Sequence, residues 1–207
     1  ILSKSLKKMG WQVFGNDNKL TEIEIPKSLE ECRYSVNSAG IDGGAFEGCA
    51  NLKTVTFEEG TTEIAEGLFA GCTGIEQITI PDTVTVIERG AFGGCINLTG
   101  IEIPDNVTEI QWHAFEYCSS LKMVKLSENL KNIGLYAFGN CNVLKSIEIP
   151  NSVTDIDGYA FVNCKELSNV ILSKSLKKMG WQVFGNDNKL TEIEIPKSLE
   201  ECRYSVN

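Results

Sequence analysis

Six cysteines recur at one fixed interval, and they are the residues of this chain with the clearest potential for chemistry. They stand 23 residues apart, at Cys49, Cys72, Cys95, Cys118, Cys141 and Cys164. Cysteines can pair as disulfides or, in clusters, bind zinc. Zinc ligands must converge on one point, whereas these thiols are spread along a line, and His113 is the only histidine. We expect a buried ladder of reduced structural thiols, although rungs about 4.8 Å apart would also be close enough for disulfides.

Other groups that could support catalysis do not converge in the sequence. A glycoside hydrolase needs two carboxyl groups in a cleft, with environments that separate their pKa values. Glu192 and Glu194 lie on one face of a predicted strand, where neither condition is met. His113 stands at a repeat position that other units fill with unlike residues, so we expect it on the surface. No catalytic residue, metal site or cofactor is predicted, and we expect a protein that is not an enzyme.

Two aspartates interrupt the cysteine ladder. Asp17 and Asp187 occupy the position that holds cysteine in other units. An unpaired carboxylate in a dry column would be costly or would become protonated, so we expect both at turns that water or backbone N–H groups can reach. A cation site built from Asp17 with Asn16 and Asn18 is the alternative, but three short side chains on one turn differ greatly from a calcium loop.

The elements that must position these residues follow from the repeat itself. The unit reads I-P-x-x-V-T-x-I-x-x-x-A-F-x-x-C-x-x-L-x-x-I-x-I and is best kept in Ile103–Leu126 and Ile149–Leu172. A unit of this length cannot bury its own apolar face, which indicates a solenoid of stacked coils. The alternating L-x-x-I-x-I part predicts strands that align into a parallel sheet. The A-F-x-x-C part predicts tight turns or brief 3₁₀ segments and a continuous stack of phenylalanine rings from Phe46 to Phe161.

These unit residues resemble the BspA-like leucine-rich repeats found in surface proteins of bacteria and some protist parasites. The similarity covers nearly the whole chain and rests on six complete copies in phase. It implies an α/β repeat solenoid, a leucine-rich-repeat right-handed superhelix with a parallel β-sheet on one face and short turn or 3₁₀ segments on the other. We expect residues 1–207 to form a single domain of about nine units, of which the first and last are partial.

Two departures from the repeat concern its phase and its ends. Pro26 and Glu58 are 32 residues apart instead of 23, so we expect a nine-residue insertion within residues 30–40, forming a loop on one face. Residues 1–37 are identical to residues 171–207. Folding constraints cannot explain identity at solvent-facing positions, so the match indicates a very recent duplication or one segment counted twice.

Charge and hydropathy limit the classes of partner. The chain has 28 acidic and 19 basic residues and a formal charge of −9, which works against nucleic acid and anionic membranes as partners. It contains no apolar run of 18 residues, and membrane insertion is not expected. The lack of a secretory leader says little, because the chain starts inside a repeat. Because the chain starts and stops inside a repeat, we expect it to be a piece of a longer protein.

A solenoid presents a long rigid surface whose outward residues can vary without disturbing the core. We therefore expect a non-catalytic interaction module that binds protein; a small-molecule ligand is not expected. The resemblance implies a cell-surface or secreted location and adhesion to host matrix or cell-surface proteins. The alternatives are a passive structural spacer in a larger surface protein and, more remotely, a non-catalytic repeat region of a wall- or glycan-acting enzyme.

The candidate binding surface combines the outward strand positions with one tryptophan. Trp112 shares its repeat position with Trp11 and Trp181, and exposed aromatic residues can anchor a partner or a sugar. A tryptophan that partly covers the edge of the solenoid is the plainer interpretation. The candidate residues are Glu22, Glu24, Thr54, Thr56, Gln77, Thr79, Glu102, Met123, Lys125, Glu148, Asn169, Glu192, Glu194 and Trp112.

Overall fold

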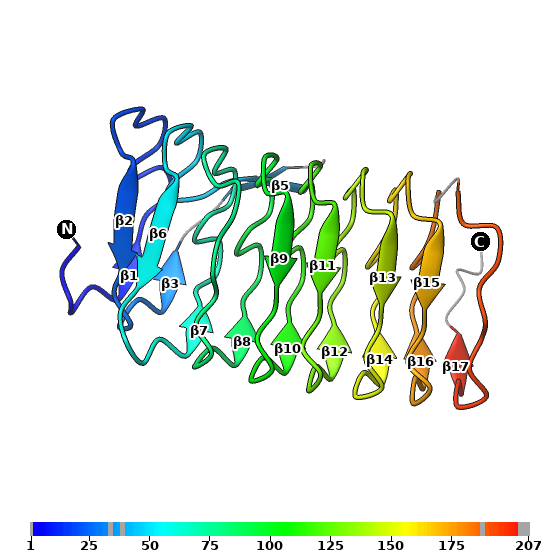
Figure 1. Cartoon of the computed structure of the whole chain (residues 1–207). Helices are drawn as coiled ribbons and strands as arrows, with labels where there is room; N and C mark the ends of the chain where they lie inside the picture. Colours follow the sequence, from blue (N-terminus) through cyan, green and yellow to red (C-terminus); the bar gives the residue numbers. More distant parts are fainter. Residues whose placement is uncertain (1, 33–34, 38–39, 187–188, 203–207) are drawn as a thin grey trace.

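The chain folds into a row of similar coils stacked along one axis (Figure 1). The computed structural model describes residues 2–32, 35–37, 40–186 and 189–202, with the backbone alone described for 35–37 and 40–42. Successive coils lie side by side in chain order, from blue at the N-terminal end to red at the C-terminal end. Among the described residues no helix is long and apolar enough to cross a membrane.

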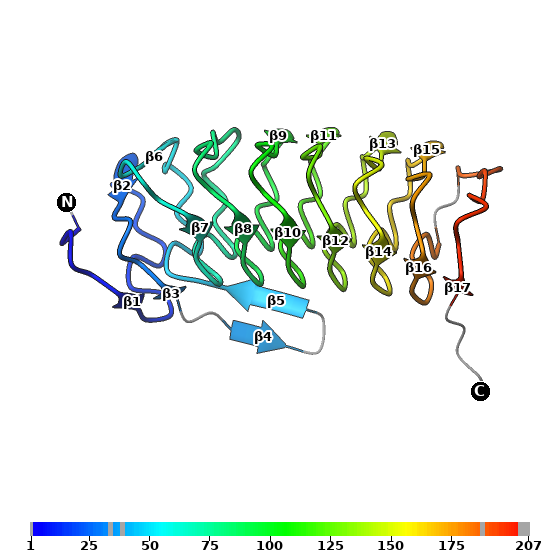
Figure 2. The same ribbon diagram turned by 90° about the horizontal axis from the view of Figure 1, so that it is seen from below.

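Two rows of short strands run along the solenoid, and most coils contribute a strand to at least one of them (Figures 1 and 2). The first row comes from the L-x-x-I-x-I part and contains β2 (Glu22–Ile25), β6 (Thr54–Phe57), β9 (Gly100–Glu102), β11 (Met123–Lys125), β13 (Ser146–Glu148) and β15 (Asn169–Ile171). The second row comes from the V-T-x-I part and contains β1 (Lys8–Met9), β3 (Glu31–Cys32), β7 (Glu63–Ile64), β8 (Val86–Ile87), β10 (Glu109–Ile110), β12 (Asn132–Ile133), β14 (Asp155–Ile156), β16 (Lys178–Met179) and β17 (Glu201–Cys202).

The longest sheet lies in the second row, which corrects the sequence expectation. Its seven strands pair in parallel in the order β17-β16-β14-β12-β10-β8-β7, with Ile110 opposite Ile133 and Ile133 opposite Ile156. The first row, where the continuous sheet was expected, forms only parallel pairs, β2 with β6, β9 with β11, and β13 with β15. A strand of two residues is too short to display a period-2 pattern, so the sequence does not predict the second row.

Of the two predicted forms of the A-F-x-x-C segments, turns are confirmed, whereas the 3₁₀ alternative and the α component of the predicted α/β class are not found in the part of the chain that the structure describes. The described residues contain neither α-helix nor 3₁₀-helix, and the A-F-x-x-C segments are turns. The reason is that alternate N–H groups in these segments bond to the next coil: the N–H of Phe92 donates to the carbonyl of Ala114 and that of Phe115 to Ala137, both at 2.8 Å. An α-helix would need those donors for its own i−4 carbonyls. The fold is therefore a parallel β-solenoid of the leucine-rich-repeat type, and its right-handed winding stays a prediction.

Stacked columns of identical side chains form the core, as predicted. The phenylalanine column extends one ring beyond the predicted range at each end, from Phe14 to Phe184, with neighbouring ring centres 5.1–5.7 Å apart. All six ladder cysteines are buried and none of the cysteines is bonded to another. The thiol of Cys118 donates to the carbonyl of Phe92 at 3.2 Å, in the preceding coil. Burial raises the pKa of the Cys72 thiol to about 11.

The aspartate in the cysteine ladder lies at a turn, as expected. Asp17 is half-buried, and its Oδ1 accepts the backbone N–H of Lys19 at 2.9 Å. The carboxylate is therefore satisfied locally. Asp187 lies outside the described residues. The described part of the chain contains no group of three or more His, Cys, Asp and Glu side chains that could hold a metal ion.

The phase shift between Pro26 and Glu58 corresponds to a hairpin. The 23-residue register persists through the pairing of Lys8 with Glu31 and Met9 with Cys32, so the extra residues follow Cys32. They include β4 (Ser35–Asn37) and β5 (Gly40–Gly43), which pair antiparallel beside the stacked coils (Figure 2). The segment that contains the insertion therefore forms a small two-stranded structure, and the predicted bounds of 30–40 stay a prediction.

Candidate functional site

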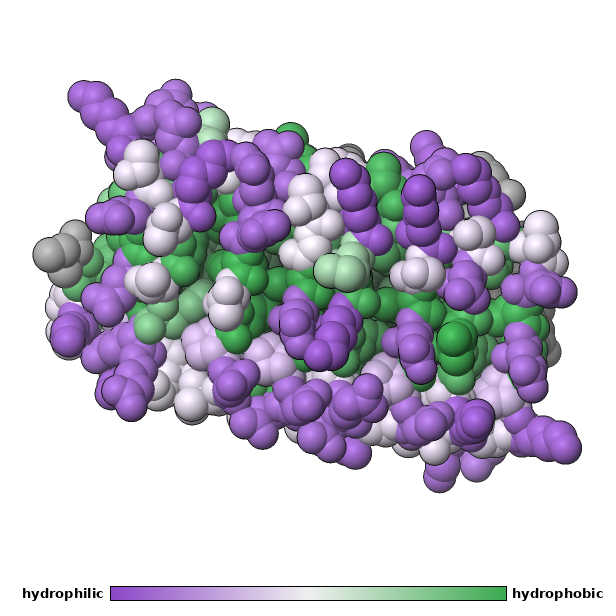
Figure 3. All heavy atoms as spheres, in the orientation of Figure 1, coloured by the Kyte–Doolittle hydropathy of each residue, from purple (hydrophilic) through white to green (hydrophobic). Residues whose placement is uncertain are grey.

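The expected binding row on the first-row strands is exposed throughout. Every candidate residue predicted there has an exposed side chain, and so does Trp112. Figure 3, in the orientation of Figure 1, shows hydrophilic side chains above and below a band of hydrophobic atoms along the solenoid. The half-buried residues Val55, Ile78, Val124 and Val170 alternate with the polar positions of this row. Whether this row binds a partner stays a prediction.

Ion pairs link successive coils within this row and beside it. Lys125 pairs with Glu102, Lys53 with Glu76, and Lys189 with Glu166, each pair joining residues 23 positions apart. The hydrogen bond and the charge of the Glu102 carboxylate raise the pKa of Lys125. Two predicted site residues, Glu102 and Lys125, thus bind each other. Exposed pairs of this kind contribute little stability, but they occupy groups that a partner would otherwise contact.

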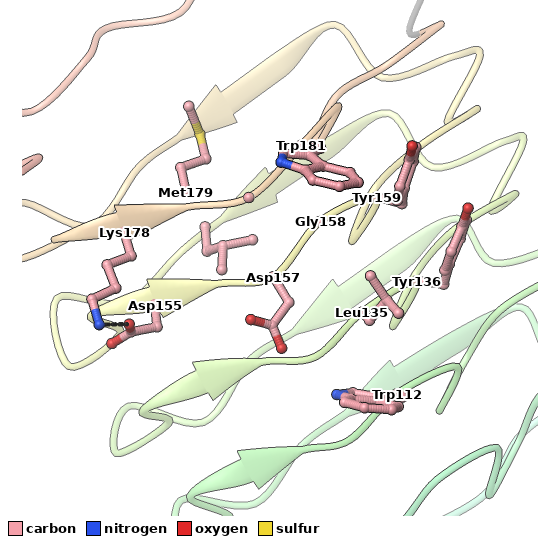
Figure 4. A pocket seen from close by; sticks show the side chains of 12 residues that line it. Trp112, Leu135, Tyr136, Asp155, Asp157, Gly158, Tyr159, Lys178, Met179 and Trp181 are labelled. Carbon is pink, nitrogen blue, oxygen red and sulfur yellow. Dashed lines mark ion pairs between the residues drawn. The ribbon is translucent and has the colours of Figure 1, made fainter. Parts of the chain in front are cut away.

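A different surface, just beyond the second-row strands, is hollowed and lined by aromatic residues. We call it the aromatic groove; its volume is about 600 Å³. Its walls combine large apolar side chains with a few charged groups (Figure 4), an arrangement typical of binding sites. The lining residues are Trp112, Leu135, Tyr136, Asp155, Ile156, Asp157, Gly158, Tyr159, Lys178, Met179, Gly180 and Trp181.

The groove opens where one coil lacks a side chain. The second residue after each second-row strand is Trp112, Leu135, Gly158 and Trp181 in successive coils. A Cβ atom at Gly158 would lie 3.3 Å from the backbone N and O of Trp181 and 3.6 Å from Cδ1 of Leu135. No side chain therefore stands between Leu135 and Trp181 in this column, whereas larger residues occupy the same position in the neighbouring coils. The backbones themselves are close, because a Cβ at Gly158 would already touch that of Trp181.

The third residue after each of these strands has a left-handed backbone. Its φ is 60° at His113, 56° at Tyr136 and 60° at Tyr159. Other coils place Gly67 and Gly90, or Gln12 and Gln182, at the same position. The conformation is held by hydrogen bonds between coils, for example from the Tyr159 N–H to the Trp181 carbonyl at 2.7 Å. A bulky residue in this region costs about 1–2 kcal/mol relative to glycine. The chain thus keeps aromatic side chains at positions where glycine would be less strained.

The rings of His113, Tyr136 and Tyr159 form a short ladder, of which Tyr136 and Tyr159 line the groove. The ring centres of His113 and Tyr136 are 5.3 Å apart, and those of Tyr136 and Tyr159 are 4.8 Å apart, with the rings nearly parallel. Burial, followed by the nearby Tyr159 and Glu116, raises the pKa of Tyr136. Its phenol is therefore neutral at physiological pH and available as a hydrogen-bond donor.

A polar chain that starts at the buried Glu116 supports the ladder and corrects the expectation for His113. The side chain of His113 is only 23% exposed, and its Nδ1 lies 2.7 Å from Oε2 of Glu116, which is 3% exposed. Behind Glu116, a row of asparagine amides bond one another: Asn163 donates to Asn140 at 2.9 Å and Asn186 donates to Asn163 at 3.0 Å. His113 is therefore part of a structural network and is not a free surface residue.

The charged residues of the groove lie opposite the tyrosines, as Figure 4 shows. Nζ of Lys178 lies 3.9 Å from Oδ1 of Asp155, and both side chains are exposed to solvent. Asp157 also lines the groove, so two carboxylates accompany one ammonium group. The aromatic faces and the acidic balance together favour a ligand that is flat or cationic.

Of the predicted site residues, only Trp112 lines this groove. Trp181, which shares the repeat position of Trp112 but is not among the predicted site residues, lines it as well. Trp11 belongs to the first coil. Sequence reasoning missed Tyr136 and Tyr159 altogether. The signal that could have found them is the column itself, because aromatic residues replace glycine there in three consecutive coils.

Comparison with known proteins agrees with this architecture. The coils and their repeating core define a leucine-rich-repeat solenoid. The model of the BspA type leucine rich repeat region, which spans six copies, matches residues 1–119, 34–143 and 85–206, and the chain belongs to this family. A comparison with curated proteins found no match.

Solved structures give the same result for the fold. A leucine-rich repeat protein from Bacteroides ovatus is 30% identical, with a TM-score of 0.77 over 95% of this chain. The chain spans about half of that protein, 49% of its length. A leucine rich repeat protein of T. pallidum is 29% identical, with a TM-score of 0.67 over 80% of each chain. A third, from Eubacterium ventriosum, is 23% identical with a TM-score of 0.64 and covers 88% of this chain and 56% of that one.

Proposed function

We propose that this chain is a non-catalytic protein-binding module of a cell-surface or secreted protein, and that it binds its partner through the aromatic groove. The observation that carries this proposal is the conjunction of exposed Trp112 and Trp181 with the strained ladder of Tyr136 and Tyr159 around one gap. Tryptophan and tyrosine are enriched among the residues that dominate binding energy at interfaces. Backbone strain that a glycine would relieve suggests a functional reason for the side chains.

The surface location rests on family resemblance, and adhesion to matrix proteins rests on the same ground. The rigid solenoid supports the proposal physically, since stacked rings and inter-coil hydrogen bonds present the groove in a fixed geometry before any partner arrives. A pre-ordered surface loses little conformational entropy on binding.

The test is binding of the purified chain to solubilised extracellular-matrix protein, with each captured protein identified, purified and measured again by surface plasmon resonance. We expect dissociation constants in the micromolar range and at least a tenfold loss for the double variant Tyr159→Ala, Trp181→Ala. The matched control is Glu102→Ala, Lys125→Ala, which alters the first-row surface and leaves the groove intact. Equal binding by both double variants and the wild type would contradict the assignment to the groove.

A structural spacer is the second candidate, favoured by the ion pairs that link successive coils on the first-row surface. A spacer needs rigidity and an evenly polar surface, with no binding site. If the wild-type chain captured no matrix protein at concentrations up to about 100 micromolar, corresponding to about 5.5 kcal/mol of binding energy, the spacer function would be preferred.

A further inference from the structure

An internal contact between Arg89 and Trp112 indicates what the aromatic groove is shaped to bind. The two residues share one repeat position in successive coils, and Cζ of Arg89 lies 5.7 Å from the centre of the Trp112 ring. A guanidinium within about 6 Å of an indole ring is attracted by the electron-rich ring face. Oε1 of Glu66, at the same position one coil earlier, lies 3.6 Å from Nε of Arg89. This column therefore holds a guanidinium between a carboxylate and an indole.

Gly158 and Trp181 stand in the same relationship three coils further along. Gly158 precedes Trp181 by 23 residues, as Arg89 precedes Trp112. The residue that would cover the indole of Trp181 from the preceding coil is thus a glycine, and the space beside it belongs to the groove. The approach of a Cβ at Gly158 to the Trp181 backbone, at 3.3 Å, shows how closely the two coils are stacked there. A side chain entering from outside can reach the same face of the indole.

The charges around this gap complement a cation. Asp155 and Asp157 line the groove together with a single cation, Lys178. Lys178 is 3.9 Å from Asp155, a separation that leaves the pair loosely bound and open to solvent. The whole chain has a formal charge of −9, so a basic partner is also attracted at long range.

We propose that the groove binds an arginine side chain of the protein partner, with its guanidinium stacked on Trp181 in the space beside Gly158. This inference rests on the proposed function, because it supplies the chemistry of the same groove. The apolar stem of the arginine packs against Leu135 and Met179, while the guanidinium faces the indole ring and the Asp157 side of the groove. The partner is therefore a protein with an exposed arginine, and the contact reproduces between two molecules what Arg89 and Trp112 form within one.

The test follows the indole N–H signal of Trp181 by two-dimensional NMR of the ¹⁵N-labelled chain. The probe is the peptide acetyl-Gly-Arg-Gly-amide, and the signal is assigned by its loss in Trp181→Phe. We expect a saturable shift with a dissociation constant in the low millimolar range and no shift of the Trp11 indole, which serves as an internal control. A peptide with citrulline, which has the shape of arginine without its charge, should bind at least fivefold more weakly. Equal binding of the citrulline peptide, or of a lysine peptide, would overturn the assignment to a guanidinium.

A pair of variants tests the position of the bound group. Gly158→Arg places a guanidinium where Arg89 stands relative to Trp112, so it should fill the site and abolish the peptide-induced shift. Gly158→Ala adds one carbon 3.3 Å from the Trp181 backbone, a contact that a shift of a few tenths of an ångström relieves, and should retain binding within about threefold. Thermal unfolding of both variants checks that the coil remains folded. Loss of binding in both folded variants, or retention in both, would show that the peptide does not occupy the space beside Gly158.

The two proposals fail in different ways. If a matrix protein binds the wild type and not the Tyr159→Ala, Trp181→Ala variant, while the arginine peptide neither shifts Trp181 nor competes with that protein, the groove binds protein by other chemistry and only the arginine inference is overturned. If the peptide binds as expected and no matrix protein does, the arginine site stands and the adhesion function fails.

Discussion

The imidazole of His113 and the carboxylate of Glu116 lie 2.7 Å apart at the base of the aromatic ladder. Glu116 is almost fully buried, and the amide of Asn140 also approaches it, at 3.5 Å. This pair connects two features that the sequence does not relate, namely the stacked rings that line the groove and the asparagine row inside the turns. It also explains why His113 keeps a strained backbone, since its ring is fixed on one side by the carboxylate and on the other by Tyr136.

Replacing Glu116 by alanine should destabilise the fold by about 2 kcal/mol, because partly buried polar groups of His113 and Asn140 lose their hydrogen-bond partner. Glu116→Gln keeps the shape and one acceptor oxygen, so its loss should be about half as large. Urea unfolding followed by circular dichroism measures both free energies. Equal stability of the alanine variant and the wild type would show that the network contributes nothing, whereas equal losses for both variants would show that charge, and not hydrogen bonding, is what matters.

Tyr159 should respond unusually to small substitutions. Because its φ is 60°, Tyr159→Gly should be about 1 kcal/mol more stable than Tyr159→Ala, the reverse of the order found at ordinary positions. Both variants lose the stacking of the Tyr159 ring, so the difference between their unfolding free energies reports the backbone strain alone. Gly90 has nearly the same φ, 62°, at the same repeat position, so Gly90→Ala should lose about 1 kcal/mol. Denaturant midpoints of the three variants measure these differences, and an alanine variant as stable as its glycine counterpart would refute the argument from strain.

Phe115 should be among the most sensitive residues of the core. Its ring is fully buried between Phe92 and Phe138, with ring centres 5.1 and 5.2 Å away. Phe115→Ala should lose about 3–5 kcal/mol by leaving a cavity in the stack. Met123→Ala, at a site 66% exposed, is the matched control and should change the free energy of unfolding by less than about 0.5 kcal/mol. A loss below about 1 kcal/mol for Phe115→Ala would mean that the ring column can collapse around the cavity.

The thiol ladder should make the protein sensitive to alkali. Burial raises the pKa of Cys72 from an ordinary value of 9.0 to about 11. Above about pH 9 the unfolded chain therefore loses this proton while the folded chain keeps it. The contribution of this thiol to the unfolding free energy is fully present below pH 9 and is lost as the pH rises toward 11. One such thiol contributes a slope of up to about 1.4 kcal/mol per pH unit.

The measurement compares the pH dependence of the unfolding free energy for the wild type and Cys72→Ala between pH 8 and pH 10.5. The variant should be less stable at pH 8, because a small cavity replaces the sulfur, but its stability should fall less steeply above pH 9. Parallel curves for the two proteins would show that Cys72 does not keep its proton in the folded state.

Much of the fold could be predicted, because the apolar residues that recur in every repeat are the residues of the core. The ring column from Phe46 to Phe161 and the buried Cys column follow from identical residues at identical positions, since stacking brings every copy into contact with the next. The turn at Asp17 could also be predicted, because a carboxylate must find a donor wherever it replaces a buried thiol. The continuous sheet could not be predicted, because strands of two residues, such as β10 (Glu109–Ile110), contain no alternating pattern.

The aromatic groove could not be predicted, because the sequence does not show which residues of neighbouring coils lie around the same gap. Trp112 and Trp181 stand in the sequence beside Trp11 as equals, yet only the first two line the gap at Gly158. Tyr136 and Tyr159 became visible as a ladder only when their left-handed backbones and ring distances were known.

By itself the sequence determined the stacked architecture, the composition of the core columns and the exposed polar row from Glu22 to Glu194, because these depend on which residues recur and on the period with which they do so. The tertiary structure alone decided which strands form the long sheet, that the turns are not helical, and where the surface is hollowed. These depend on hydrogen bonds between coils and on the direction in which each side chain leaves the backbone. At Gly158 the decisive feature is a missing side chain between Leu135 and Trp181, which matters only once the neighbouring coils are in place.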